Sequence, residues 1–143
     1  MYFNELKIGM IVQTEPAVID EQKMLAFAWE YNNVPLHTDP EYAKNTPFGK
    51  VIAPGVMSFM CVWAKYLQVD FFGEQLLAGK STKIEWFRPV FAGDTLTGAA
   101  TITNLIPRGE RNGIAELKID AFNQNGDMVL TSVTEAIVKC KKN

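Results

Sequence analysis

The chain has 143 residues, of which 48% are apolar and 21% are charged. This length and composition are typical of one folded domain and exclude a disordered chain. The formal net charge of −2 comes from 14 basic and 16 acidic residues, so the chain lacks the positive excess with which proteins bind nucleic acid. We therefore expect one domain over residues 1–143 and no nucleic-acid partner.

The cysteines and the apolar segments bear on localisation. Cys61 and Cys140 are too few for a disulfide framework, and a reducing cytoplasm is the simpler expectation. The most apolar segment, residues 51–64, is shorter than the roughly 20 residues that span a bilayer, and Pro54-Gly55 interrupts it. The first residues lack the pattern of a signal peptide. These features predict a soluble, cytoplasmic protein with no membrane partner.

The chain is predicted to begin with a strand and a helix. The strand is expected near residues 9–18. Residues 20–31 carry apolar side chains at helical spacing, and Asp20 is in the position of an N-cap, so this segment predicts a helix. The helix is expected to end at Asn32-Asn33, because asparagine tolerates the backbone conformation found at helix ends.

Two further helices are predicted, one short and one long. Asp39 and Pro40 are typical of an N-cap and of the first helical position, and they predict a short helix over residues 39–44. After Pro54, apolar residues lie almost all the way round a helix as far as Leu67. Such a helix is expected to be buried on most sides.

The second half of the chain has the period of two that is typical of strands. Four long strands are expected, at residues 79–87, 95–105, 114–122 and 129–139. Asn125-Gly126 is a strong signal for a tight hairpin, so the last two strands should pair antiparallel. Together with the long helix, this order predicts an α+β fold in which an antiparallel meander wraps the helix.

The only histidine, His37, falls in an irregular segment between the predicted helices. A lone histidine is more often structural or exposed than catalytic, although imidazole is suited to acid–base work near neutral pH. None of the five residues before it is acidic. The nearest carboxylates are Glu30, which is expected to point elsewhere from a helix end, and Asp39, which is expected to serve as a helix cap.

Two parts of the sequence, in order and separated by the predicted long helix, resemble a known family. The first is the run 35–43 with 46–49 and 51–57, and the second is the run Phe-Arg-Pro-Val-Phe-Ala-Gly-Asp-Thr-Leu at 87–96. Both are similar to recurrent segments of the MaoC-like family of (R)-specific enoyl-thioester hydratases and dehydratases. The resemblance covers most of the chain and implies a hot dog fold, in which an antiparallel sheet wraps one long helix.

The resemblance also assigns catalytic positions. His37 aligns with the family histidine, but Asn32 occupies the position of the family aspartate, five residues before it. Shifting the alignment by one residue places Tyr31 there, so neither register supplies a carboxylate. In the family, the aspartate and histidine share the water, and backbone N–H groups near the start of the long helix, here around Gly55, hold the thioester oxygen. His37, Asn32 and Gly55 are therefore the expected catalytic positions.

The remaining expectations also follow from the resemblance. Substrate-binding roles fall on Pro54, Val56 and Met57. The implied reaction is reversible hydration of a trans-2-enoyl thioester of CoA or acyl-carrier protein to the (R)-3-hydroxyacyl thioester. It needs no metal or redox cofactor, and the family implies a homodimer or higher homo-oligomer.

Simpler interpretations and other functions stay open. Asn32 can be an ordinary helix end, and Gly55 can simply let the helix approach a strand. Trp86 and Arg88 are most simply explained as sheet packing and a strand-end charge. Because an amide positions water but does not exchange protons, the chain can instead be an acyl-CoA thioesterase or a non-catalytic acyl-thioester binding protein.

Overall fold

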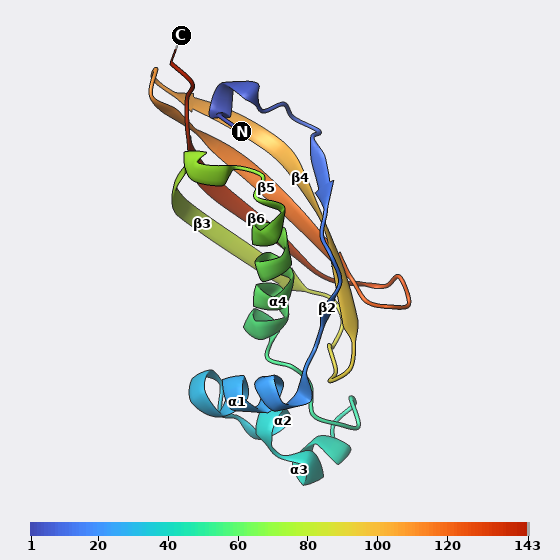
Figure 1. The fold of residues 1–143 in the computed structure, drawn as a ribbon. Helices are drawn as coiled ribbons and strands as arrows, with labels where there is room; N and C mark the ends of the chain where they lie inside the picture. Colours follow the sequence, from blue (N-terminus) through green and yellow to red (C-terminus); the bar gives the residue numbers. More distant parts are fainter. Residues whose placement is uncertain (143) are drawn as a thin grey trace.

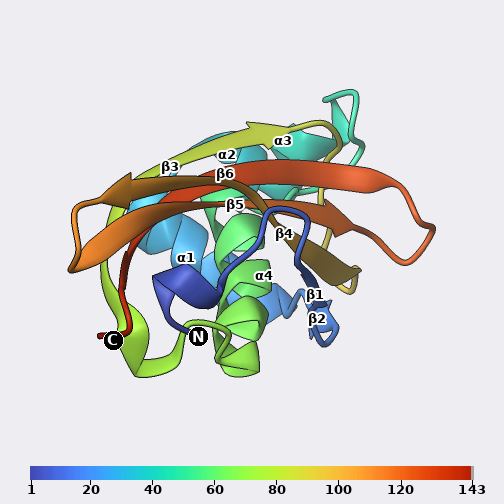
Figure 2. The same cartoon turned by 90° about the horizontal axis from the view of Figure 1, so that it is seen from above.

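The computed structural model describes residues 1–142, in which a curved antiparallel sheet arches over one long helix (Figures 1 and 2). The elements in chain order are η1 (Phe3–Glu5), β1 (Ile11–Gln13), β2 (Ala17–Val18), α1 (Glu21–Tyr31), α2 (Pro35–Thr38), α3 (Pro40–Lys44), α4 (Gly55–Val69), η2 (Gly73–Gln75), β3 (Leu76–Trp86), β4 (Thr95–Arg108), β5 (Asn112–Phe122) and β6 (Met128–Lys139). The α+β class is confirmed. No helix within residues 1–142 is long and apolar enough to cross a membrane.

The six-stranded sheet has the order β1-β4-β5-β6-β3, and β2 pairs with β4. The predicted antiparallel pairing of β5 with β6 is confirmed, with Gly126 at a φ of 78° in the connecting turn. The predicted meander is wrong for β3, which pairs with β6 at the far edge of the sheet. The segment 87–94 that joins β3 to β4 contains Pro89 and is too long for a tight hairpin, so it can cross the end of the sheet instead.

The predicted early strand is divided into β1 and β2, and Thr14 lies at the break. The Thr14 backbone N–H donates to the Gly98 carbonyl at 2.9 Å. In return, the Gly98 N–H donates to the Thr14 hydroxyl oxygen at 2.8 Å. A side chain therefore takes the place of one backbone acceptor, and Pro16, which has no N–H, further interrupts the ladder.

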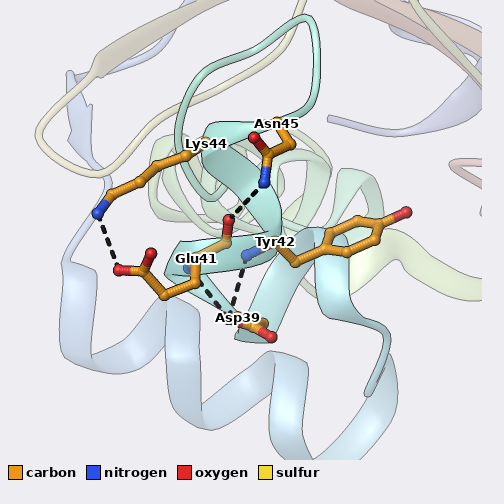
Figure 3. Close-up of polar contacts among 5 residues, drawn as sticks. All are labelled: Asp39, Glu41, Tyr42, Lys44 and Asn45. Atoms are coloured by element: carbon orange, nitrogen blue, oxygen red, sulfur yellow. Dashed lines mark hydrogen bonds and ion pairs between the residues drawn. The ribbon is translucent and has the colours of Figure 1, made fainter.

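Both predicted N-caps are confirmed. Asp20 Oδ1 accepts a hydrogen bond from the Lys23 N–H at 2.9 Å at the start of α1. Asp39 Oδ1 accepts from the N–H groups of Glu41 and Tyr42 at 3.0 and 3.2 Å, as Figure 3 shows. These bonds satisfy donors that a helix leaves free in its first turn, and they hold α3 against the end of α2.

One side of α4 is buried, and the other side is not. The buried side chains are Met57, Ser58, Phe59, Val62 and Tyr66. They face the inward side chains of β4, β5 and β6, which are buried in alternation. The expectation of burial on most sides is wrong, because Val56, Met60 and Leu67 are each close to half exposed. Strand β3 is also exposed along nearly all of its length, so an apolar strip of α4 and the face of β3 stay uncovered within one chain.

Candidate functional site

His37 lies on α2, a single helical turn where an irregular segment was expected, and this expectation is wrong. The His37 side chain is buried, and its Nδ1 is 2.8 Å from the Ile52 carbonyl oxygen. A carbonyl oxygen only accepts hydrogen bonds, so Nδ1 carries the proton. In the neutral form of the imidazole, the lone pair therefore lies on Nε2.

A pocket of about 480 Å³ lies beside His37 at the N-terminal end of α4. Four of the predicted site residues line it, namely Asn32, His37, Gly55 and Val56. In Figure 1, α1, α2 and α3 gather below this end of α4, while the chain termini lie at the opposite end of the molecule. Residues that are 23 positions apart in the chain, Asn32 and Gly55, thus meet at one cavity.

The other two predicted substrate-binding residues do not line the pocket. Pro54 is fully buried, and Met57 packs into the hydrophobic core with 6% of its surface exposed. The geometry of the helix explains this placement of Met57. Successive residues turn by about 100°, so the side chain two positions after Gly55 points to the opposite side of α4.

The start of α4 brings backbone donors to the pocket. Pro54 is the N-cap and has no N–H, and the first intrahelical hydrogen bond runs from the Ser58 N–H to the Pro54 carbonyl at 3.1 Å. The N–H groups of Gly55 and Val56 therefore have no acceptor inside the helix. Both residues line the cavity, where the positive end of the helix dipole adds to their attraction for a negatively charged oxygen.

Gly55 is also packed tightly against the strand at the sheet edge. A Cβ atom built on Gly55 would lie 2.5 Å from Cε2 and 2.6 Å from Nε1 of Trp86, at the end of β3. Only glycine lets the indole ring come this close to the helix backbone. Gly55 therefore allows a close approach between helix and strand, as the simpler interpretation states, and it also lines the pocket.

Within residues 1–142, no Asp or Glu side chain lines this pocket. The Asp39 carboxylate is engaged in capping α3, and Glu30 lies exposed on α1. Tyr31, which takes the acid position in the shifted alignment, is 69% exposed. A hydrogen bond with Glu30 and the charge of Glu30 raise the pKa of Tyr31, so its phenol stays protonated. Among the side chains that line the pocket in residues 1–142, His37 is the one that carries an imidazole, a group used for acid–base work in proteins.

Sequence reasoning assigned no site role to three further lining residues, Ser58, Trp86 and Arg88. The Ser58 hydroxyl donates to the Gly55 carbonyl at 2.7 Å, one helical turn back. Arg88 belongs to the second family segment and Trp86 directly precedes it, which was the available signal. The position of Trp86 and Arg88 beside α4 depends on the pairing of β3 with β6, whereas the expected meander placed β3 next to β4. Within residues 1–142, His, Cys, Asp and Glu side chains do not gather into a metal-binding group.

An antiparallel sheet wrapped around one long helix defines the hot dog fold. A solved structure of a protein described as a monoamine oxidase regulatory protein from Archaeoglobus fulgidus has the same fold, with a TM-score of 0.93 and 31% identity. The match covers 99% of this chain and 96% of that one. The MaoC like domain matches residues 4–121, so the chain belongs to the MaoC-like family, and the resemblance read from the sequence is confirmed.

Two comparisons link the chain to hydratases in particular. The (R)-specific enoyl-CoA hydratase of Aeromonas caviae is 33% identical over 110 residues, which cover 73% of each chain. A solved (R)-hydratase from A. caviae, described as involved in PHA biosynthesis, has a TM-score of 0.73 and 28% identity. That match covers 95% of this chain and 98% of the hydratase. The family of this chain therefore includes (R)-specific enoyl-CoA hydratases.

Proposed function

We propose that the protein is an acyl-thioester hydratase or dehydratase. It reversibly adds water to a trans-2-enoyl thioester of CoA or acyl-carrier protein and gives the (R)-3-hydroxyacyl thioester. The observation that carries the proposal is the buried His37, whose Nδ1 is held by the Ile52 carbonyl beside a pocket that also receives the start of α4. The relatedness to the A. caviae hydratase supports it.

The proposed chemistry uses side chains and backbone groups at this pocket. Nε2 of His37 takes a proton from water as the water oxygen attacks the β-carbon, and the resulting imidazolium returns a proton to the α-carbon. The side-chain amide of Asn32 holds the water through hydrogen bonds. The N–H groups at Gly55 and Val56 bind the thioester oxygen, on which negative charge develops in the transition state.

We also propose a homodimer, in the cytoplasm. The half-exposed apolar side chains of α4 and the uncovered face of β3 form a surface that a second copy can bury. Cys61 and Cys140 are free thiols, which suits a reducing compartment.

A second candidate function is a non-catalytic acyl-thioester binding protein. It is favoured by one specific observation, the lack of any Asp or Glu among the pocket-lining residues of the described chain. A positioned acid–base group typically contributes about 10²- to 10⁴-fold to a rate. A pocket with one such group instead of two is therefore either slower at hydration or used for binding alone.

One assay set tests these proposals. The wild type, His37→Ala and Asn32→Asp are incubated with crotonyl-CoA, and hydration and free-thiol release are followed together. We expect the wild type to hydrate, His37→Ala to lose about 10²- to 10⁴-fold in rate, and Asn32→Asp to gain.

The other outcomes separate the alternatives. Thiol release without hydration assigns thioesterase activity. Binding without turnover, together with hydration by Asn32→Asp, assigns the binding function. A wild type that neither binds nor hydrates any acyl thioester contradicts both proposals.

A further inference from the structure

The charge of the pocket is unbalanced. Arg88 lines it, and within residues 1–142 no carboxylate does. The ion pairs of the described residues are formed by five lysines, Lys44, Lys80, Lys83, Lys118 and Lys141, and none involves Arg88. The positive charge is local, because the chain as a whole has a net charge of −2. The start of α4, with the positive end of its dipole, lines the same pocket.

The backbone that carries Arg88 is fixed on both sides. The N–H groups of Phe87 and Arg88 both donate to the Val129 carbonyl on β6, at 2.9 and 3.4 Å. On the other side, the Val90 carbonyl accepts a hydrogen bond from the Ala53 N–H at 2.7 Å, just before α4 begins. Pro89 further restricts Arg88 to an extended conformation. Arg88, an exposed residue, is therefore carried by a fixed backbone at the edge of the cavity.

A second cation lies near this segment of the chain. Lys50 Nζ is 4.5 Å from the centroid of the Phe91 ring, in a cation–π contact. Phe91 directly follows Val90, and Phe48, two residues before Lys50, lines the pocket. Lys50 itself does not line the cavity, but in the sequence it lies between two lining residues, Phe48 and Ile52.

We infer that Arg88 binds an anionic oxygen group of the ligand. The guanidinium offers a planar set of donors that matches phosphate and carboxylate in two-pronged hydrogen bonds. The inference rests on the proposed function, because that function makes the ligand an acyl thioester. Such a ligand can offer anionic oxygens in two parts, the phosphates of the carrier and a carboxylate on the acyl chain.

The experiment uses isothermal titration calorimetry to compare the binding of three thioesters that cannot be hydrated, and free thiol is measured at the end of each titration to check that the ligand is intact. Hexanoyl-CoA and S-hexanoyl-N-acetylcysteamine differ only in the carrier, since the second lacks every phosphate. S-adipoyl-N-acetylcysteamine has the same number of acyl carbons as the hexanoyl compound and ends in a carboxylate. The proteins are the wild type, Arg88→Gln, Arg88→Lys and the control Arg108→Gln. Arg108 is an exposed arginine and the last residue of β4. The hairpin that joins β4 to β5 lies at the end of the sheet away from α1, α2 and α3 (Figure 1).

We expect Arg88→Gln to weaken the binding of one anionic ligand by about tenfold or more, as loss of a charge-assisted hydrogen bond does. A loss confined to hexanoyl-CoA assigns the carrier phosphate. A loss confined to the adipoyl compound assigns an acyl carboxylate. Arg88→Lys should recover part of the affinity, because it keeps the charge and loses only the fork geometry.

Two results would overturn the inference. One is that Arg88→Gln binds every ligand within about twofold of the wild type, and the other is that Arg108→Gln weakens binding equally. Unchanged thermal unfolding of Arg88→Gln shows that the variant is folded. All three ligands are saturated, so the outcome does not depend on hydration. Hydration of crotonyl-CoA without any Arg88 effect rejects only this inference, whereas Arg88-dependent binding without hydration rejects only the proposed hydratase.

Discussion

At the scale of single residues, His37 and Gly55 reach the same pocket by different means. His37 is held by one hydrogen bond to the Ile52 carbonyl, which selects the ring nitrogen that carries the proton. Gly55 has no side chain, and the Trp86 indole occupies the space where a Cβ would lie. His37 is therefore positioned by a hydrogen bond, whereas Gly55 lets a strand approach the start of a helix.

The packing of Gly55 against Trp86 gives a stability prediction. Gly55→Ala should reduce the free energy of unfolding by about 1–3 kcal/mol, because the new methyl group overlaps the indole ring. Trp86→Ala introduced together with Gly55→Ala should remove most of this penalty. Urea unfolding of the wild type, the two single variants and the double variant measures the coupling.

Gly79→Ala is the matched control for this cycle. It adds the same methyl group on β3, where a Cβ meets no atom within 4 Å. Equal losses at positions 55 and 79, or additive losses in the double variant, would contradict the overlap.

The residues of the candidate site were only partly predictable. His37, Asn32 and Gly55 stand out because they occupy motif positions, and the structure brings all three to one cavity. Arg88 and Trp86 join them through pairing between β3 and β6, which a local pattern cannot reveal. Whether these residues carry the reaction stays a prediction.

At the scale of elements, α2 and α3 share one residue, Asp39. It ends α2, the turn that holds His37, and its side chain caps α3. Figure 3 shows the two capping bonds together with the Lys44–Glu41 ion pair. That pair is mostly exposed and contributes little, whereas the cap satisfies two backbone donors in the first turn of α3.

Substitutions of Asp39 can distinguish its structural role as a helix cap from a catalytic role of its carboxylate. Asp39→Ala should lower the free energy of unfolding by about 1 kcal/mol, whereas Asp39→Asn should not, because asparagine caps helices as well as aspartate does. If hydration is confirmed, Asp39→Asn should keep it, since the carboxylate does not line the pocket. Denaturant unfolding and the crotonyl-CoA assay measure the two effects. Loss of hydration with unchanged stability in Asp39→Asn would instead make Asp39 the acid–base partner of His37.

The elements themselves were predictable where the pattern is long. The last three strands and both N-caps agree with the structure, because alternation over many residues and capping chemistry are local signals. The turn α2 was missed, since four residues are too few to show helical periodicity. The position of β3 was wrong, because strand order depends on contacts distant in sequence.

At the scale of the whole molecule, α4 and β3 leave apolar surface exposed. Helix α4 presents Val56, Met60 and Leu67. Within residues 1–142, β3 is hydrogen-bonded on one edge only, to β6. A long exposed edge strand beside an apolar strip invites pairing with another chain. Contact between copies would explain why α4 has apolar residues almost all the way round, including on the side that one chain leaves exposed.

The proposed dimer is tested at this surface. Met60→Glu should convert the dimer to a monomer, because it places a carboxylate where apolar side chains are expected to meet. Ile106→Glu is the matched control, since Ile106 is similarly exposed at the end of β4. Size-exclusion chromatography with light scattering measures the mass of each. A monomeric wild type at micromolar concentration, or equal dissociation of both variants, would contradict this interface.

The two ends of the described chain lie side by side. The Asn4 side chain donates to the Lys141 carbonyl at 3.3 Å and accepts from the Lys141 N–H at 3.0 Å. The Phe3 ring covers Gly113 so closely that a Cβ there would lie 2.4 Å from it. Because residues near the two ends of the described chain are in contact, a short linker can join them, and new termini can be introduced at the turn between β5 and β6. Such a circular permutant would keep every strand of the sheet while moving both termini toward the end of the molecule that holds the pocket.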